Sequence, residues 1–310
     1  MAKQPVVLIV GPTAVGKTAL SLTIAEQFKG EIISGDSMQV YRGMDIGTAK
    51  ATPEERSTVP HHLIDILDPS EPFSVQLFQK LARHEIDQIA SRGHLPIVAG
   101  GTGLYVEALV YEYQMPNVTE DPAYRQKWWQ FAVDHGAVAL HQELHRVDPA
   151  SAVRIHPNDT KRIIRAMEVT EKTGIPFSEL TKKGESRYDA LWIGLTMPRD
   201  QLYERINKRV DLMIEEGLLE EVKGLREAGY HLPLTSIQAI GYKEIYQYLE
   251  GELSLEAAIE RIKKGTRNYA KRQLSWFRRM PDIQWFDVTN PNVFTEIPKW
   301  MAGKFSQYRE

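Results

Sequence analysis

The chain has 310 residues, a net charge of −3 at pH 7 and no cysteine. The absence of cysteine excludes disulfide bonds, thiolate catalysis and cysteine-ligated zinc. The net charge means that any nucleic acid must be bound through a local basic patch.

The composition, with 42% hydrophobic and 25% charged residues, is ordinary for a globular protein, and the length lies where one core gives way to two lobes. The apolar run near the N-terminus is too short for a signal peptide, and no segment approaches the roughly 20 apolar residues of a membrane span. We therefore expect a soluble, cytoplasmic protein without membrane contact.

A strand, a glycine-rich loop and a helix are predicted at the start of the chain. Val6–Val10 is an apolar run typical of a buried parallel strand, and Thr18–Lys29 has helical spacing with a stop at Gly30. The intervening sequence GPTAVGKT fits the pattern G-x-x-x-x-G-K-[ST] in full, between the strand and the helix that this pattern requires. We therefore expect a phosphate-binding loop.

The loop offers three kinds of group to a phosphate. Its backbone N–H groups point at phosphate oxygens, and the dipole of the following helix adds to the attraction. Lys17 adds a positive charge, and the Thr18 hydroxyl can ligate Mg²⁺. The phosphate-binding residues are predicted to be Gly11, Pro12, Thr13, Ala14, Val15, Gly16, Lys17 and Thr18.

Further strands and helices alternate along the first third of the chain. A strand is predicted at Glu31–Ser34, a helix at Phe73–Ala90 and another strand at Leu95–Ala99. Strand character returns late in the chain, at Asp189–Leu195 and Ile283–Asp287. This alternation predicts an α/β fold with a doubly wound parallel sheet.

Residues 115–185 carry several short helical patterns and no convincing strand. Helices are predicted at Asp121–His135, Val138–Arg146 and Thr160–Lys172, and a long one later, near Ser254–Arg279. We therefore predict a P-loop core in two parts, residues 1–114 and 188–310, interrupted by an all-helical insertion, residues 115–187.

Two polar residues follow predicted strands at the edge where ligand sites of α/β sheets form. Asp36 is either a general base or metal-organising carboxylate, or a turn residue that caps backbone N–H groups. Thr102 either reaches the same crevice or serves only the turn Gly100-Gly101-Thr102-Gly103.

Two usual companions of the loop in nucleotide hydrolases are missing. The strand Leu95–Ala99 ends without the carboxylate that holds the metal, and no N-K-x-D motif for guanine is present. This counts against nucleotide hydrolysis. An RNA-binding switch driven by ATP or GTP and a small-molecule P-loop kinase remain as alternatives.

Basic charge gathers in two stretches. Arg261–Met280 has eight Lys/Arg and no acid, with Tyr269, Trp276 and Phe277 interleaved. A second cluster, Lys161–Arg165, opens a predicted helix. Both stretches suit contact with a phosphate backbone, and both suit salt bridges to surrounding glutamates equally well.

Six motifs together resemble one known family. They are GPTAVGKT (11–18), SGDSMQVYRGMDIGTAK (34–50), PHHLIDILDP (60–69), VAGGTGLY (98–105), RIHPNDTKRIIRAME (154–168) and QAIGYKE (238–244). The chain resembles the bacterial tRNA dimethylallyltransferases, which prenylate an adenosine beside the anticodon. The resemblance runs from the first strand to about residue 280, with no departure at the positions that carry the chemistry.

The resemblance implies that the loop holds dimethylallyl diphosphate together with Mg²⁺, with Thr18 as a metal ligand. The dimethylallyl group would pass to N6 of the adenosine on the 3′ side of the anticodon, in tRNAs reading codons that begin with U, giving N6-isopentenyladenosine and diphosphate. Asp36 would be the general base, and Lys17 and Thr102 would support the reacting centre. No water has to be aligned for hydrolysis, which accounts for the missing carboxylate.

The resemblance also implies which residues contact the tRNA anticodon stem-loop. They would be Asp36, Ser37, Met38, Gln39, Arg125, Lys161, Arg162, Ile163, Ile164, Arg165, Gln238, Gly241, Tyr242 and Lys243. A related family prenylates free adenine nucleotides, but a free nucleotide needs neither the helical insertion nor the basic stretch. We expect a monomer, because the insertion and the core together can enclose one stem.

Overall fold

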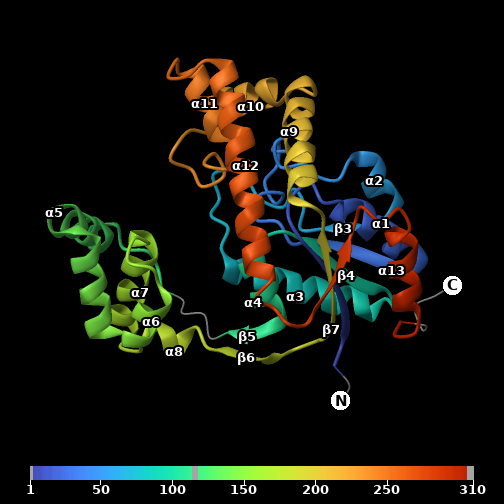
Figure 1. Cartoon of the computed structure of the whole chain (residues 1–310), viewed down its shortest axis with the longest axis horizontal. Helices are drawn as coiled ribbons and strands as arrows, with labels where there is room; N and C mark the ends of the chain where they lie inside the picture. Colours follow the sequence, from blue (N-terminus) through green and yellow to red (C-terminus); the bar gives the residue numbers. More distant parts are fainter. Residues whose placement is uncertain (1–2, 114–117, 306–310) are drawn as a thin grey trace. The chain divides into compact units, whose positions relative to one another are not determined.

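The computed structural model of the chain describes residues 3–113 and 118–305 (Figure 1). It divides into two compact units, one formed by Met1–Val110 with Arg187–Glu310 and the other by Tyr111–Ser186. The predicted boundary between residues 114 and 115 lies outside the described residues.

The first unit is built on a six-stranded sheet with the order β3-β2-β4-β1-β7-β8, in which every pairing is parallel. Its strands are β1 Pro5–Val10, β2 Gly30–Ser34, β3 His61–His62, β4 Leu95–Gly100, β7 Asp189–Thr196 and β8 Ile283–Asp287. All side chains of Val6–Val10 are fully buried, as expected for a central strand covered on both faces. The predicted α/β fold with a parallel sheet is confirmed.

Helices of the first unit include the three that the sequence predicts, at Thr18–Lys29, Phe73–Ala90 and near Ser254–Arg279. The helices of this unit are α1 Lys17–Gln27, α2 Pro53–Thr58, α3 Val75–Ser91, α4 Gly103–Val110, α9 Arg199–Glu215, α10 Leu218–Glu227, α11 Tyr242–Leu249, α12 Leu255–Phe277 and α13 Val293–Ala302. Within the described parts of the chain, none of the helices has the length and apolar character needed to cross a membrane.

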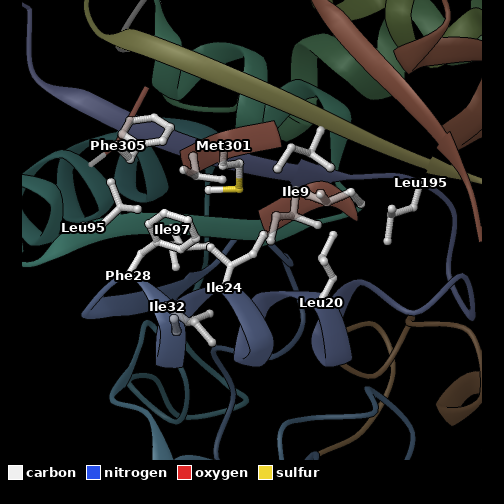
Figure 2. Close-up of a cluster of buried hydrophobic side chains, with 14 of the residues drawn as sticks. Ile9, Leu20, Ile24, Phe28, Ile32, Leu95, Ile97, Leu195, Met301 and Phe305 are labelled. Carbon is white, nitrogen blue, oxygen red and sulfur yellow. The ribbon is translucent and has the colours of Figure 1, made fainter. Parts of the chain in front are cut away.

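One apolar cluster joins α1 and α13 to the sheet (Figure 2). Leu20 and Ile24 of α1 and Phe28 directly after it lie four residues apart on one face, and all three are fully buried against strand residues such as Ile9 and Ile97. Burying each such side chain contributes about 1.5–3 kcal/mol to folding. This packing fixes the start of α1, and therefore the glycine-rich loop before it, at the edge of the sheet.

A second apolar cluster holds the segment that follows β2 against the helices α10, α11 and α12. Val40, Tyr41 and Met44 of that segment are fully buried, and they pack in the same cluster as Leu218 and Tyr242 of the helices. The segment has almost no regular secondary structure of its own, so its course depends on this packing.

In its described residues, the second unit consists of four helices and a two-stranded antiparallel ribbon formed by its first and last segments. The helices are α5 Pro122–Val147, α6 Pro149–Arg154, α7 Thr160–Thr173 and α8 Phe177–Leu180. A kink at Gly136 divides α5 where the sequence predicts a break between two helices. The prediction of an all-helical insertion is wrong in one respect, because β5 Tyr111–Tyr113 pairs with β6 Lys183–Ser186. Strands this short and this exposed carry no detectable alternation in the sequence.

Candidate active site

A pocket of about 330 Å³ lies at the carboxyl edge of the sheet, in the first unit. Its walls come from the loop after β1, from the segments after β2 and β4, and from α9 and α12. Along the sheet, β4 and β7 flank β1, while the chain passes from β1 to β2 beyond β4. Ligands of parallel sheets bind at such points, where the strand order changes direction.

The glycine-rich loop forms one wall of this pocket. Of its residues, Thr13, Ala14, Gly16, Lys17 and Thr18 line the pocket, whereas Gly11, Pro12 and Val15 are buried behind it. Helix α1 begins at Lys17, so its free backbone N–H groups lie at the pocket. The geometry therefore suits an anion, as the motif predicts.

Lys17 brings a positive charge to the same wall. Its ammonium donates hydrogen bonds to the backbone carbonyls of Gly11 and Pro12, at 3.1 and 2.7 Å. Burial lowers the pKa of Lys17 to about 8, with the Asp36 carboxylate opposing the shift and the Arg209 guanidinium adding to it. A phosphate beside the ammonium would favour its charged form.

Asp36 lines the pocket opposite this lysine, on the segment that follows β2. One of its carboxylate oxygens accepts a hydrogen bond from the Met38 N–H at 2.8 Å, so Asp36 both stabilises a turn and faces the site. Burial raises the pKa of Asp36 above its usual value, although the Met38 N–H and the charge of Lys17 act in the opposite direction. A raised pKa makes this carboxylate a stronger base than one in water.

The structure adds two arginines that sequence reasoning missed. Arg205 and Arg209 lie one turn apart on α9 and both line the pocket. Neither forms an ion pair within the described residues. The sequence shows their spacing of four, but nothing in it indicates that this face of α9 meets the glycine-rich loop. With Lys17, they give the pocket three cationic side chains.

Helix α12 closes the pocket through Gln273, which is buried. Its amide oxygen accepts a hydrogen bond from the Thr13 N–H at 2.9 Å, and its amide nitrogen donates one to the Gly101 carbonyl at 3.0 Å. A Cβ atom at residue 101 would lie 2.1 Å from that nitrogen, so a larger residue there would displace the Gln273 amide. Gln273 therefore joins the turn after β1 to the turn after β4.

Thr102 follows directly behind this wall and does not line the pocket itself. Its buried hydroxyl has no hydrogen-bond partner of good geometry among the described residues, and its polar neighbour is the phenol of Tyr269. Tyr269 does line the pocket, and burial, followed by the charge of Asp36, raises its pKa to about 12. Tyr269 therefore offers a neutral hydroxyl to the site.

The pocket fits Mg²⁺ only as an ion shared with a bound phosphate. Among residues 3–113 and 118–305, no three His, Cys, Asp or Glu side chains are grouped so as to hold a metal. Mg²⁺ commonly keeps several waters and takes one or two protein oxygens together with substrate phosphates. The Thr18 hydroxyl, which lines the pocket, can supply such an oxygen.

The basic stretch on α12 is mostly free of acidic partners. Of its eight cations, Lys263 pairs with Asp211 and Glu260, and Arg267 bonds to Asn207. The remaining six are exposed and form no ion pair within the described part of the chain: Arg261, Lys264, Lys271, Arg272, Arg278 and Arg279. Salt bridges therefore neutralise little of this charge, and binding of a polyanion is the better interpretation of the basic stretch.

The QAIGYKE motif divides into exposed and buried residues. Gln238 and Lys243 are exposed, whereas Gly241 and Tyr242 are buried. The prediction that Tyr242 contacts tRNA through its side chain is wrong, because this side chain is fully buried and its hydroxyl donates to Glu221 at 2.6 Å. Ser37 and Met38, in contrast, are partly exposed beside Asp36.

The predicted tRNA-contacting residues of the second unit also divide. Lys161 and Arg162 are exposed, without an ion pair in the described residues. Ile163 and Ile164 are 0% and 3% exposed within the core of this unit, so the prediction of tRNA contact by their side chains is wrong. The helical pattern could have shown this, because apolar residues in a basic cluster face inward.

Arg125 and Arg165 share one buried acidic partner. The Glu168 carboxylate is fully buried and accepts hydrogen bonds from both, at 2.8 and 2.7 Å, and from the Asp121 N–H at 2.7 Å. Burial alone would raise the pKa of Glu168, but the bonds from Arg125 and Arg165 hold it below its usual value. These two arginines are therefore partly neutralised, and they position α7 in addition to any contact with RNA.

Replacing Glu168 by glutamine is expected to destabilise the second unit by about 3 kcal/mol, because two guanidinium groups lose their buried counter-charge. Hydrogen exchange of α5 and α7 amides measures this. The loss of stability relative to wild type should shrink as the pH falls below about 4.3. The Glu168 carboxylate, whose pKa is lowered in the folded protein, stabilises the fold only while it is charged. Glu179→Gln, which affects an exposed pair with Lys182, is the matched control, and equal effects of the two would contradict the assignment.

Comparisons with known proteins agree with this geometry. A sequence model of the IPP transferase family matches residues 39–280, and one described as isopentenyl transferase matches residues 4–65. A tRNA dimethylallyltransferase of Geobacillus thermodenitrificans is 53% identical over 308 residues, which cover 97% of each chain.

Solved structures give the same result. The full-length tRNA isopentenylpyrophosphate transferase of Bacillus halodurans is 50% identical, with a TM-score of 0.74 and coverage of 99% of this chain and 98% of that one. A eukaryotic dimethylallyltransferase acting on tRNA is 32% identical, with a TM-score of 0.78 and coverage of 99% and 80%. By sequence over most of its length and by fold, this chain belongs to the IPP transferase family.

Proposed function

We propose that this protein transfers the dimethylallyl group of dimethylallyl diphosphate to N6 of the adenosine on the 3′ side of the anticodon, in tRNAs that read codons beginning with U. The observation that carries the proposal is one pocket that combines a phosphate-binding loop with a partly buried carboxylate, Asp36. Relatives that match almost the whole chain are tRNA dimethylallyltransferases. A tRNA substrate would place the protein in the cytoplasm, and the monomeric state stays a prediction.

The reaction forms a bond between adenine N6 and the first carbon of the prenyl group, and it breaks the bond from that carbon to diphosphate. The bonding electrons leave with the diphosphate, and the N6 proton passes to Asp36. The adenine amine is a weak nucleophile because its lone pair is delocalised into the ring. A partly buried carboxylate with a raised pKa can both orient this amine and accept its proton.

Negative charge grows on the diphosphate as it leaves. The loop N–H groups and the cations Lys17, Arg205 and Arg209 all line the pocket, where they can stabilise this charge. Mg²⁺, with Thr18 as its protein ligand, would supply further positive charge to the same oxygens. The Tyr269 hydroxyl, with Thr102 as its polar neighbour, lies in the same pocket within the electrostatic range of Asp36.

An adenine in an anticodon arm can reach the pocket only if it is extruded from its stack. Unpaired loop bases cost least to extrude, and single-stranded loops are where proteins read RNA sequence. Ser37 and Met38 lie beside Asp36 and are partly exposed, so they can contact the neighbouring nucleotides. The six cations without ion pairs in the basic stretch Arg261–Met280, and Lys161 and Arg162 of α7, suit the phosphates of the stem.

The test is to incubate the protein with Mg²⁺, unmodified tRNA and dimethylallyl diphosphate labelled in its prenyl group. We expect label in tRNA, and nucleoside digestion should place it on adenosine N6. Parallel reactions contain γ-labelled ATP, or AMP in place of tRNA. Transfer or release of the γ-phosphate, or faster labelling of AMP than of tRNA, would overturn the proposal.

A further inference from the structure

The segment from Asp36 to Lys50 forms two parts of the pocket. Asp36 lies at its start, and Thr48 and Ala49 line the pocket near its end. The segment between them contains no helix and no more than an isolated β-bridge, at Tyr41. Its conformation therefore depends on side chains that bond to it from other elements.

Gln39 connects the two ends of this segment. Its amide oxygen accepts a hydrogen bond from the Ser34 hydroxyl at 2.7 Å, and its amide nitrogen donates to the carbonyls of Thr48 and Ala49, both at 3.2 Å. The Ser34 hydroxyl oxygen in turn accepts from the Asp36 N–H at 3.4 Å. Gln39, which sequence reasoning assigned to tRNA contact, thus has its amide occupied within the protein.

Glu221 of α10 holds the middle of the segment. Its carboxylate accepts hydrogen bonds from three consecutive backbone N–H groups, those of Asp45, Ile46 and Gly47, at 2.9, 2.7 and 3.2 Å. Three converging N–H groups form an anion-binding nest, and here a carboxylate of the same chain fills it.

Tyr242 of α11 supports this carboxylate from the other side. Its hydroxyl donates to Glu221 at 2.6 Å, and burial, followed by the charge of Glu221, raises the pKa of Tyr242 so that the hydroxyl stays protonated. A Cβ atom at residue 47 would lie 2.5 Å from the Tyr242 ring, so the close packing of ring on backbone requires Gly47. Tyr242 of the motif QAIGYKE therefore packs against the segment and does not face solvent.

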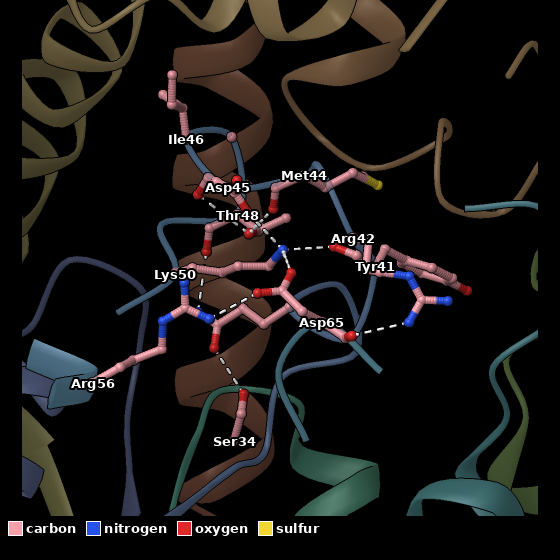
Figure 3. Close-up of polar contacts among 12 residues, drawn as sticks. Ser34, Tyr41, Arg42, Met44, Asp45, Ile46, Thr48, Lys50, Arg56 and Asp65 are labelled. Atoms are coloured by element: carbon pink, nitrogen blue, oxygen red, sulfur yellow. Dashed lines mark hydrogen bonds and ion pairs between the residues drawn. The ribbon is translucent and has the colours of Figure 1, made fainter. Parts of the chain in front are cut away.

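Lys50 fixes the far end of the segment (Figure 3). Its side chain is 2% exposed, and its ammonium donates to the Tyr41 carbonyl and to the carboxylates of Asp45 and Asp65, at 2.6, 2.7 and 2.5 Å. Arg56 also pairs with Asp65, at 2.8 Å. Lys50 bonds to the side chain of Asp45, and Glu221 bonds to its backbone N–H, so both hold the segment at this residue.

We propose that Glu221 and Tyr242 are positioning residues for the transfer reaction, acting on Asp36 through the segment between them. Tyr242 donates to Glu221, and Glu221 accepts from the N–H groups of residues 45–47. Gln39 donates to the neighbouring carbonyls of Thr48 and Ala49 and accepts from the Ser34 hydroxyl, which in turn accepts from the Asp36 N–H. This proposal rests on the proposed function, because it concerns the placement of the same carboxylate.

The expected effect is on turnover rather than on binding. A displacement of about 1 Å at a reacting group can cost about a hundredfold in rate, even when the cause lies far from the chemistry. Glu221→Gln places an amide donor among three N–H donors and should lower kcat at least about tenfold. Tyr242→Phe removes a single bond and should lower kcat less. The KM values for tRNA and dimethylallyl diphosphate should stay within about twofold of wild type, since neither side chain lines the pocket.

The experiment compares Glu221→Gln, Tyr242→Phe and Gly47→Ala with Glu220→Gln. Glu220 is the adjacent residue on α10, its side chain is 72% exposed, and its partner is Lys223, so this control makes the same charge change without touching the segment. Gly47→Ala should resemble Tyr242→Phe or exceed it, because the added methyl group displaces the ring. Thermal unfolding of each variant shows whether the fold persists, and Tyr242→Phe, as the mildest change, keeps the test valid if Glu221→Gln does not fold.

Loss of kcat in the three variants, with KM retained and Glu220→Gln unchanged, is the expected result. Turnover of Glu221→Gln and Tyr242→Phe equal to that of Glu220→Gln would overturn the proposal, and so would a raised KM for tRNA with unchanged kcat. If the wild-type protein itself transfers no prenyl group, the proposed function fails. Hydrogen exchange at residues 45–47 then still tests whether Glu221 holds the segment, with faster exchange expected in Glu221→Gln.

Discussion

Replacing Asp36 by asparagine is expected to lower the single-turnover rate of prenyl transfer by about 10²–10⁴-fold, the usual contribution of a general base. An amide oxygen can still accept the hydrogen bond from the Met38 N–H, so the turn should persist while the proton acceptor is lost. Binding of tRNA, measured by filter retention, should stay within a few-fold of wild type. Asp287→Asn is the matched control, because Asp287 accepts the same kind of bond from the Thr289 N–H outside the pocket.

The pH dependence of kcat/KM provides an independent check of the same role. A base acts when deprotonated, and burial raises the pKa of Asp36, so the rate should rise with pH through a value above that of an ordinary aspartate. Above about pH 8 the free enzyme should lose rate again as Lys17 loses its proton. Asp36→Asn should abolish the rise at low pH. A residual rate near that of wild type, with the rise intact, would assign the base to another group.

The sequence was sufficient where one local pattern determines both conformation and contact. GPTAVGKT lies between a strand and a helix, as the motif requires, and the strands at Val6–Val10 and Leu95–Ala99 agree with β1 and β4 within one residue. Fully apolar, β-branched runs have one stable place in a parallel sheet, which is its buried interior. Asp36 follows from the same logic, because the carboxyl ends of parallel strands meet at one edge.

Residues that reach the site from distant helices could not be predicted in this way. Arg209 and Gln273 line the pocket from α9 and α12. Arg209 lies in an ordinary amphipathic pattern and Gln273 in the basic stretch Arg261–Met280, and neither pattern indicates contact with the glycine-rich loop. The sequence separation between these residues and the loop hides the contact from local patterns, because Gln273 bonds to Thr13 across 260 residues. For Tyr242 the motif identified the residue but not its role. Only the packing shows that Tyr242 is buried and bonds to Glu221.

Replacing Lys17 by methionine is expected to lower kcat by about 10²–10³-fold, the usual cost of removing one group that stabilises charge in a transition state. The same change should leave the fold at pH 7 as stable as wild type or more so, because the buried ammonium has a lowered pKa and its charge opposes folding. Between about pH 8 and the ordinary lysine pKa of about 10.4, the unfolded chain holds this proton and the folded chain does not. The stability of the wild type therefore rises with pH in this range, and the stability gap between Lys17→Met and the wild type closes. Urea unfolding at pH 7 and pH 10 measures the gap, and Lys208→Met, an exposed change on α9, is the control. Lower stability of Lys17→Met at pH 7 would mean that the ammonium bonds to Gly11 and Pro12 hold the loop together, and that part of any lost rate is structural.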